Sequence, residues 1–281
     1  MSRFQTYETA WCPGCGNFGI LKSLKTALEE LGKDPHEVLM VAGIGQAAKT
    51  PQYISANSFC GLHGRGLPAA IAAKMSNEKL TVIVNSGEGD TYGEGGNHWI
   101  HNIRRNVDIA HFVHDNQIYG LTKGQASPTS GEGQVTGAQP GGSINTPLNP
   151  MLMAIAAGAG FVARGFSGDQ EHLTQIMKEA IEYKGYALVD IFQPCVSFNK
   201  VNTFGFYKQK VYRLGEDYDP TNKLAAMEKA MEFDETIPIG VLYRQEKATY
   251  HQKNEVLKGG TPLIDREFDS KVVENFIAEF V

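Results

Sequence analysis

Residues 80–90 read LTVIVNSGEGD: an apolar run from Leu80 to Val84 is followed by the turn Gly87-Glu88-Gly89-Asp90. A second apolar run begins at Ile109 and ends in Asp115-Asn116-Gln117-Ile118-Tyr119-Gly120. The interval between the two ends suits one βαβ crossover, so we predict parallel strands whose carboxyl ends meet at one edge of a sheet. The pattern therefore indicates an α/β fold with a mainly parallel sheet flanked by helices.

Oxygen ligands for a hard cation are available at both strand ends. Glu88 offers a carboxylate, Asn116 a side-chain amide and Ile118 a backbone carbonyl. Mg²⁺ prefers such ligands and usually shares them with a phosphate, and glycines let the backbone approach that phosphate closely. We predict a Mg²⁺ site that holds a diphosphate, in which Asp90 could instead supply or support the ligand. The alternative is a strand and tight turn that bind nothing.

Two other phosphate-binding patterns fit less well. A dinucleotide-binding turn needs Gly-x-Gly-x-x-Gly, and here the third glycine, Gly93, comes one position late. The P-loop pattern Gly-x-x-x-x-Gly-Lys-Ser/Thr does not occur. Residues 93–98 lead instead into a helical pattern, so we expect a helix N-terminus to face the phosphate as well.

Composition sets broad limits. The 281 residues, of which 42% are hydrophobic, suffice for one large α/β domain or a domain with an extension. A net charge of −5 gives no nucleic-acid-binding footprint. The sequence has neither an N-terminal signal segment nor a run of about 18 apolar residues, so we predict a cytoplasmic protein.

The four cysteines leave several interpretations open. A cytosolic location disfavours disulfides. The spacing Cys12-x-x-Cys15 occurs in zinc sites, redox dithiols and iron–sulfur clusters, and buried cysteines are often merely structural. The number of cysteines does not choose among these possibilities.

Several longer stretches resemble one known family. In chain order they are Trp11-Cys12-Pro13-Gly14-Cys15-Gly16-Asn17, Gly43-Ile44-Gly45-Gln46, Gly61-Leu62-His63-Gly64-Arg65, Gly95-Gly96-Asn97-His98, Asn116-Gln117-Ile118-Tyr119-Gly120-Leu121-Thr122-Lys123-Gly124-Gln125 and Gln193-Pro194-Cys195. Over residues 1–200 the chain is similar to the β subunit of the 2-oxoacid:ferredoxin oxidoreductases. The resemblance implies the thiamine diphosphate-binding fold, bound thiamine diphosphate with Mg²⁺, and one 4Fe–4S cluster.

The resemblance also implies the cluster ligands. Cys12, Cys15 and Cys195 match ligand positions of the family. The family commonly has a fourth cysteine where this chain has Gln46, so we predict that the ligand has moved to Cys60, because such a cluster generally needs four thiolates. The alternative is that Cys60 is a packed thiol and that the cluster is altered or absent.

The metal motif departs from the family as well. The usual Gly-Asp-Gly reads Gly87-Glu88-Gly89 here, which lengthens the carboxylate by one methylene and keeps its charge. By resemblance, Lys49 and Lys123 are expected near the substrate and His63 at the cofactor, and all three are candidate catalytic residues. The alternatives are a solvated loop amine for each lysine and a hydrogen bond in a buried turn for His63. The candidate cofactor contacts are Gly45, Gln46, His63, Gly87, Gly89, Asp90, Asn116, Ile118, Gly120, Leu121 and Thr122.

The implied activity is the coenzyme A-dependent oxidative decarboxylation of a 2-oxoacid, 2-oxoglutarate or a pyruvate-like acid. Electrons would pass through the cluster to ferredoxin. The family needs a separate α subunit for the second thiamine module, so we expect a heterodimer or an (αβ)₂ assembly and an inactive isolated chain. The alternatives are a non-oxidative thiamine-dependent decarboxylase or synthase without a cluster, and a non-catalytic scaffold that binds metal through cysteines.

Periodicity predicts the remaining elements. Helices are expected at 18–31, 66–75, 150–163, 171–183 and 222–232, and strands at 38–42 and 186–192. Residues 123–147 have no periodicity and are rich in Gly, Ser, Thr, Pro and Gln, which favours an active-site loop. We predict a cofactor-binding domain at 1–200 and an extension at 201–281 that packs on the domain or on a partner subunit.

Overall fold

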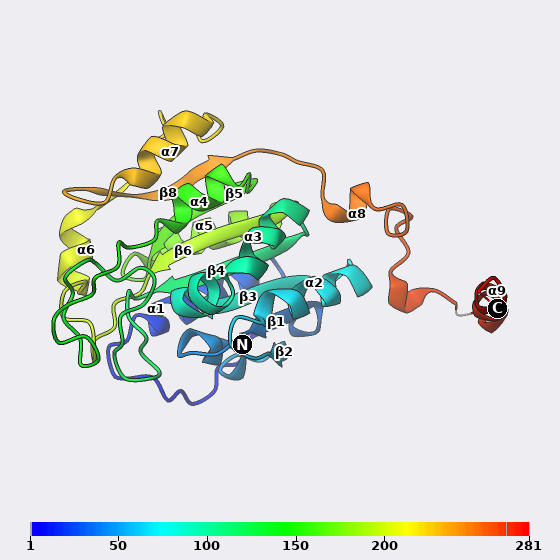
Figure 1. Ribbon diagram of the computed structural model, residues 1–281, viewed down its shortest axis with the longest axis horizontal. Helices are drawn as coiled ribbons and strands as arrows, with labels where there is room; N and C mark the ends of the chain where they lie inside the picture. The colour runs from blue at the N-terminus through cyan, green and yellow to red at the C-terminus, as the bar shows by residue number, and fades with distance from the viewer. Residues whose placement is uncertain (1, 268, 281) are drawn as a thin grey trace.

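The computed structural model describes residues 2–267 and 269–280. They form an eight-stranded sheet in the order β2-β1-β3-β4-β6-β5-β8-β7, in which neighbouring strands are parallel except β5 and β8 (Figure 1). The strands are β1 (Val38–Ala42), β2 (Asn57–Cys60), β3 (Thr81–Gly87), β4 (Ile109–Asp115), β5 (Phe161–Phe166), β6 (Tyr186–Phe192), β7 (Val211–Arg213) and β8 (Ile237–Arg244). The mainly parallel α/β fold is thus confirmed.

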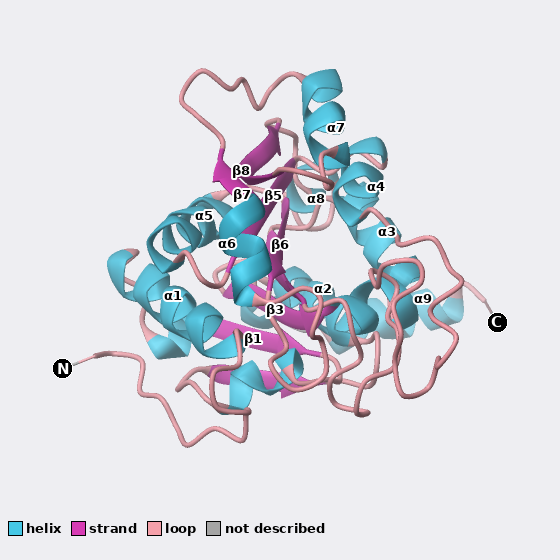
Figure 2. Ribbon diagram, turned by 90° about the vertical axis from the view of Figure 1, so that its left-hand side faces the viewer, coloured by secondary structure: helices cyan, strands magenta, loops and turns pink. Residues whose placement is uncertain are grey.

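Helices cover both faces of the sheet (Figure 2). One face packs against α1 and α5, and the opposite face packs against α2, α3, α4 and α7. The helices are α1 (Asn17–Glu30), α2 (Gly66–Ser76), α3 (Gly96–Arg105), α4 (Pro150–Ala156), α5 (Gln170–Glu182), α6 (Phe204–Lys210), α7 (Lys223–Met231), α8 (Tyr250–Lys253) and α9 (Ser270–Ala278). Short 3-10 helices are η1 (Pro35–Glu37), η2 (Ala47–Gln52) and η4 (Leu263–Asp265), and η3 (Gly89–Glu94) is a π-helix.

The strands that carry the site are buried on both faces. Every residue of β4 and β6 is buried, which is why these segments read as continuous apolar runs rather than alternating ones. The expected strands at 38–42 and 186–192 match β1 and β6. The expected helices at 18–31, 66–75, 171–183 and 222–232 correspond, within one residue at each end, to α1, α2, α5 and α7.

The predicted helix at 150–163 is wrong in its second half. It ends with α4 at Ala156, and residues 161–166 form β5 instead. Gly158, at φ +88°, ends the helix, because a left-handed residue cannot continue it. The run Phe161-Val162-Ala163 pairs with β6, and this contact between distant segments is absent from the local pattern.

In the C-terminal part of the chain, β7 and β8 extend the sheet beyond β5, and the described residues after α8 (254–267 and 269–280) form an arm. After α8 the chain runs outward to α9, which projects away from the sheet (Figure 1, red). The Lys79 ammonium, 2.9 Å from the Asp265 carboxylate, ties η4 to the main body. The exposed apolar side chains of the arm are Val256, Leu263, Ile264, Val272, Val273, Phe276, Ile277 and Phe280.

Among residues 2–267 and 269–280, none of the helices combines the length and the apolar character needed to cross a membrane.

Candidate cofactor site

The three predicted Mg²⁺ ligands meet at the carboxyl ends of β3 and β4. These strands are neighbours, with Gly87 in register with His114. The Ile118 N–H donates to Glu88 Oε1 at 3.1 Å and to Asn116 Oδ1 at 3.0 Å. The structure therefore brings Glu88, Asn116 and the Ile118 backbone together, as the strand ends predicted.

The Tyr119 ring packs directly against Gly89 and leaves no room for a side chain at that position. A Cβ on Gly89 would lie 2.2 Å from Tyr119 Cε1, which no real side chain tolerates. Gln117, at φ +56°, makes the left-handed bend that returns the chain toward β3. The close approach of the two turns thus depends on the glycine that follows Glu88.

Three carboxylates are buried in or at the ends of adjacent strands. Glu88, Asp115 and Asp190 are each 3% exposed or less. Burial is the main cause that raises the pKa of all three, to about 6 for Asp115 and well above the usual value for Glu88 and Asp190, and the charge of Asp115 raises the latter two further. Arg164, also buried, opposes the shifts of Asp115 and Asp190. The group carries more negative than positive charge when ionised, which suits a divalent cation.

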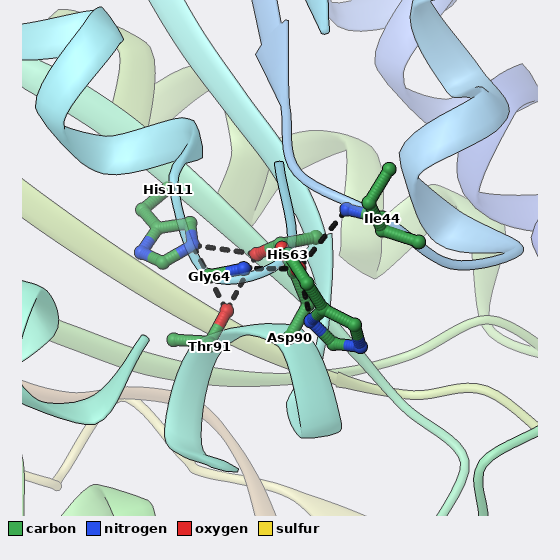
Figure 3. A network of polar contacts seen from close by, with 7 residues as sticks. Ile44, His63, Gly64, Asp90, Thr91 and His111 are labelled. Carbon is green, nitrogen blue, oxygen red and sulfur yellow. Dashed lines mark hydrogen bonds and ion pairs between the residues drawn. The ribbon is translucent and has the colours of Figure 1, made fainter. Parts of the chain in front are cut away.

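The Asp90 carboxylate is bonded to the loops that follow β1 and β2 (Figure 3). Its Oδ1 accepts hydrogen bonds from the Ile44 N–H at 3.0 Å and the Gly64 N–H at 2.7 Å, and it lies 2.9 Å from His63 Nδ1. Burial raises the pKa of Asp90, and these donors oppose the shift. A Cβ on Gly43 would be 2.2 Å from Asp90 Oδ2, so the carboxylate fills the space that this glycine leaves.

His63 is fixed by Asp90 and remains accessible. Because a carboxylate accepts hydrogen bonds, His63 Nδ1 carries the proton toward Asp90 and Nε2 is left for another partner. The side chain is 39% exposed, and its ring centroid lies 6.5 Å from that of Tyr119, which places it beside the Glu88 group. Its location agrees with a role at a bound cofactor.

The two predicted lysines lie in different surroundings. Lys49 is half-buried in η2, the short helix that follows Gln46. Lys123 is exposed in the turn after Gly120, with φ +74°. Both segments follow strand carboxyl ends, so the two amines border the same edge of the sheet as His63.

Three of the four cysteines gather next to this group. The Cys15 N–H bonds the Cys12 carbonyl at 3.0 Å, and the Gly16 N–H bonds the Pro194 carbonyl at 3.3 Å, so the Cys12–Cys15 turn sits on the segment that contains Cys195. Burial raises the pKa of the Cys15 thiol to about 11, and the charges of Cys195 and Cys12 add to the shift. A Cβ on Gly120 would lie 3.9 Å from both Cys195 Sγ and Asn116 Nδ2.

Cys60 is the predicted fourth cluster ligand, and Gln46 stands where the resembled family commonly has that cysteine. Cys60 ends β2, in register with Ala42, and its side chain is exposed. The Gln46 carbonyl accepts a hydrogen bond from Trp11 Nε1 at 2.8 Å, so Gln46 lies beside Trp11, the residue that precedes Cys12. Gln46 Oε1 is buried and has no hydrogen-bond partner among the described residues.

Within residues 2–267 and 269–280, no three His, Cys, Asp or Glu side chains are close enough to hold one metal ion. Mg²⁺ also accepts amide and carbonyl oxygens, so the donors at Glu88, Asn116 and Ile118 fit this cation. Cys12, Cys15 and Cys195 offer three of the four thiolates that a 4Fe–4S cluster generally needs.

Residues 123–147 form a loop that folds back over the site. Thr129 Oγ1 donates to Asp115 Oδ1 at 2.8 Å, and Ser130 Oγ donates to the Gln117 carbonyl at 2.6 Å. A hydrogen bond from Ser127 opposes the pKa rise of Glu88. The loop is thus anchored to the end of β4 by its own hydroxyl groups.

Some residues of the site were not predicted in their roles. Tyr119 covers Gly89, Thr129 satisfies Asp115, and Gln193 contacts both Asn116 and Cys15. The stretch Gln193-Pro194-Cys195 contributed to the resemblance. The contacts of Gln193 were not predictable, because Asn116 and Cys15 lie 77 and 178 positions away and no local pattern relates them to Gln193.

Two known families match consecutive parts of the chain. Residues 38–191 match the C-terminal TPP binding domain of the thiamine pyrophosphate enzymes. Residues 195–259 match the C-terminal part of the pyruvate ferredoxin oxidoreductase β subunit. The first match runs from β1 to β6 and includes Glu88, Asn116 and Ile118, so the site lies within a thiamine pyrophosphate-binding domain.

Relatives extend the likeness beyond these two segments. The chain is 46% identical over 257 residues to the 2-oxoacid:ferredoxin oxidoreductase subunit beta of Saccharolobus solfataricus, covering 86% of this chain and 84% of that protein. It is 42% identical over 192 residues to the 2-oxoglutarate oxidoreductase subunit KorB of Mycobacterium tuberculosis, covering 68% of this chain and 52% of that protein.

A solved structure agrees. The 2-oxoglutarate:ferredoxin oxidoreductase from Magnetococcus marinus, with 2-oxoglutarate, coenzyme A and succinyl-CoA bound, matches with a TM-score of 0.90 and 35% identity, covering 98% of this chain and 96% of that chain. The chain belongs to the β subunits of the 2-oxoacid:ferredoxin oxidoreductases. It is therefore an enzyme subunit, as the resemblance implied.

The buried charge predicts a pH dependence of stability. Because the pKa of Asp190 is raised in the folded state, the folded protein keeps a proton that the unfolded chain has released, so stability falls as pH rises toward the folded value. His111 and His114, whose pKa values burial lowers to about 3, lower stability only below their unfolded value of about 6.5. Above about pH 6.5, the buried carboxylates therefore determine how stability changes with pH.

We expect Asp190→Asn to flatten this slope. The amide retains an acceptor for the Tyr92 hydroxyl, which donates to Asp190 Oδ2 at 2.6 Å, and removes the titration. In urea unfolding of the metal-free chain, the wild type should lose stability relative to the variant as pH rises above the unfolded Asp value of about 3.9, by at most about 1.4 kcal/mol per pH unit. The exposed Asp217→Asn is the control. Equal slopes in Asp190→Asn and wild type would refute the assignment.

Proposed function

We propose that the protein is the thiamine diphosphate- and cluster-binding subunit of an enzyme that converts a 2-oxoacid and coenzyme A to an acyl-CoA and CO₂ and passes the electrons to ferredoxin. One observation carries the proposal: Gly120 lies between the proposed Mg²⁺ ligand Asn116 and the proposed cluster ligand Cys195. A Cβ added at Gly120 would be 3.9 Å from Asn116 Nδ2 and 3.9 Å from Cys195 Sγ, so the two proposed sites are neighbours. Neighbouring sites of this kind suit a reaction that must remove electrons from a bound substrate.

The proposed cofactor contacts follow from this arrangement. Glu88, Asn116 and the Ile118 carbonyl would hold Mg²⁺, and through it the diphosphate. The longer Glu88 side chain is supported by its contact with the Ile118 N–H. The other proposed contacts are Gly45, Gln46, Gly87, Gly89, Gly120, Leu121 and Thr122, with Asp90 acting through His63 and the loop amides.

Each residue has a limited task in the proposed reaction. Thiamine diphosphate, when bound, supplies the carbanion chemistry at the keto carbon. His63 Nε2 would hold or move a proton beside the bound cofactor, since Nδ1 is engaged by Asp90. Lys49 and Lys123 would attract the substrate carboxylate. The loop that Thr129 and Ser130 anchor would exclude water.

The substrate is proposed as 2-oxoglutarate or a pyruvate-like acid. Support for 2-oxoglutarate comes from the Magnetococcus marinus enzyme, whose structure contains 2-oxoglutarate and succinyl-CoA, and from the Mycobacterium tuberculosis relative named for that acid.

The cofactor content tests the proposal. We expect the chain, co-purified anaerobically with its partner subunit, to contain about four irons, about four acid-labile sulfides and one thiamine diphosphate per β chain. Glu88→Ala should lose the thiamine diphosphate and keep the iron, and the exposed Glu216→Ala should keep both. Thiamine diphosphate without iron would instead indicate a non-oxidative decarboxylase, and the absence of both would indicate a scaffold.

The fourth cluster ligand is tested separately. Our proposal that Cys60 supplies it predicts that Cys60→Ser bleaches the visible absorption of the cluster and lowers the iron content. Ser58→Ala, at another exposed position of β2, is the control. Unchanged iron and sulfide in Cys60→Ser would make Cys60 a bystander and assign the fourth position to a group other than a cysteine.

A partner subunit is proposed to cover the site and the arm. Apolar side chains are exposed around the site, with Ile44 at 39%, Leu62 at 76% and Leu121 at 41%. The arm adds a helix whose apolar stripe includes Phe276 and Ile277, each 60% exposed. Surfaces of this kind are typical of protein interfaces. We propose that an α subunit, in an αβ or (αβ)₂ assembly, contacts both.

The arm provides a direct test of assembly. The double substitution Phe276→Glu and Ile277→Glu should weaken binding of the α subunit, because it places charge in the apolar stripe. Analytical ultracentrifugation of the co-expressed subunits would measure the effect. Leu224→Glu on α7, at a residue 73% exposed, is the matched control. Unchanged assembly in the double variant would show that the arm does not contact the partner.

A further inference from the structure

Gln193, directly after β6, links the two proposed cofactor sites through a continuous chain of hydrogen bonds. Asn116 Nδ2 donates to Gln193 Oε1 at 3.1 Å. Gln193 Nε2 donates to Cys15 Sγ at 3.4 Å and to the Pro194 carbonyl at 3.0 Å. The residue is 1% exposed, and both polar atoms of its side chain have partners. A buried amide satisfied in this way is held rigidly.

The direction of this chain is fixed at one end. The Ile118 N–H donates to Asn116 Oδ1 at 3.0 Å, and a backbone N–H can only donate. Asn116 must therefore turn its NH₂ group toward Gln193, and Gln193 must turn its oxygen toward Asn116. The NH₂ group of Gln193 is then directed at the Cys15 sulfur, so its donor role follows from the partners and not from an arbitrary choice of amide orientation.

The backbone is shaped to admit Gln193 at this place. A Cβ on Gly16 would lie 3.0 Å from Gln193 Cγ and 3.1 Å from Nε2. The Gly16 N–H also bonds the Pro194 carbonyl at 3.3 Å, which holds the cysteine turn against the end of β6. The glycine after Cys15 thus allows the amide to reach the sulfur.

We propose that Gln193 is a positioning residue for both cofactors. Its oxygen orients the Asn116 amide so that Oδ1 faces the metal, and its N–H adjusts the reduction potential of the cluster through Cys15. A hydrogen bond to a ligand sulfur favours the reduced cluster, which carries more negative charge, and so raises its potential. The inference rests on the proposed function and deepens it, because one side chain adjusts diphosphate binding and electron acceptance together.

Two substitutions separate the two roles. Gln193→Met has a similar length and neither donor nor acceptor. Gln193→Glu keeps an oxygen that can accept from Asn116 and offers no N–H to Cys15 when ionised. In the αβ complex, the dissociation constant of thiamine diphosphate in the presence of Mg²⁺ reports the first role. The midpoint potential of the cluster, from a dye-mediated anaerobic titration, reports the second.

We expect Gln193→Met to bind thiamine diphosphate about 10- to 100-fold more weakly, the usual effect of removing an outer partner of a metal ligand, and to shift the potential to a more negative value. Gln193→Glu should shift the potential in the same direction while its affinity for thiamine diphosphate stays near that of the wild type. The exposed Gln175→Met is the control and should change neither quantity.

The outcomes are distinguishable. Wild-type potentials in both variants would overturn the role at Cys15, and wild-type affinity in Gln193→Met would overturn the role at Asn116. If Gln193→Met fails to assemble, Gln193→Glu, which matches the native side chain in volume, still decides the potential. A wild-type complex without a cluster or thiamine diphosphate would overturn the proposed function and this inference with it.

Discussion

The burial of three carboxylates in or directly after the neighbouring strands β3, β4 and β6 is the constraint on which the rest of the site depends. Glu88 follows β3, Asp115 ends β4 and Asp190 lies in β6, and all three are almost completely excluded from water. Isolated buried charges are costly, so each must be protonated, hydrogen-bonded or paired with a cation. Tyr92 donates a hydrogen bond to Asp190, and Thr129 donates one to Asp115. The positive charge of Arg164 opposes the rise in the pKa of Asp190. For Glu88 the structure offers the Ile118 N–H, which also bonds Asn116 Oδ1, so the oxygens of Glu88 and Asn116 lie together in an arrangement suited to a divalent cation.

A fourth buried carboxylate organises the backbone around this charge. Asp90 binds the amides of Ile44 and Gly64 and the His63 ring, and therefore joins the loops after β1 and β2 to the π-helix after β3. Gly43 and Gly64 leave no room for a side chain, because a Cβ would overlap the Asp90 carboxylate in the first case and the Glu94 backbone in the second. The loops that would surround a cofactor are thus positioned by one acceptor and by close backbone packing, which gives a pre-organised site.

The three neighbouring cysteines and the buried carboxylates are connected through a few short contacts. Gly120, Asn116 and Gln193 lie between Glu88 and the cysteines, so a change on one side reaches the other through only a few hydrogen bonds. Apolar side chains are exposed both around the site, at the carboxyl ends of the strands, and along the arm, which is tied to Lys79 at the amino end of β3. Exposed apolar surface of this kind agrees with a β subunit, a chain that belongs to an assembly.

The sequence by itself determined the elements whose signal is local. Strands buried on both faces, such as β1 and β6, read as continuous apolar runs, and the Glu88, Asn116 and Ile118 group was predictable because consecutive parallel strands bring their carboxyl ends together. The strands β2, β5, β7 and β8 were not predicted: β2 and β7 are edge strands of only four and three residues, and β5 and β8 pair with each other although they are distant in sequence. Only the tertiary structure assigned Asp90 to the loop amides, Tyr119 to Gly89 and Gln193 to Cys15. Such contacts depend on strand order and helix packing, which the periodicity of a single segment does not encode.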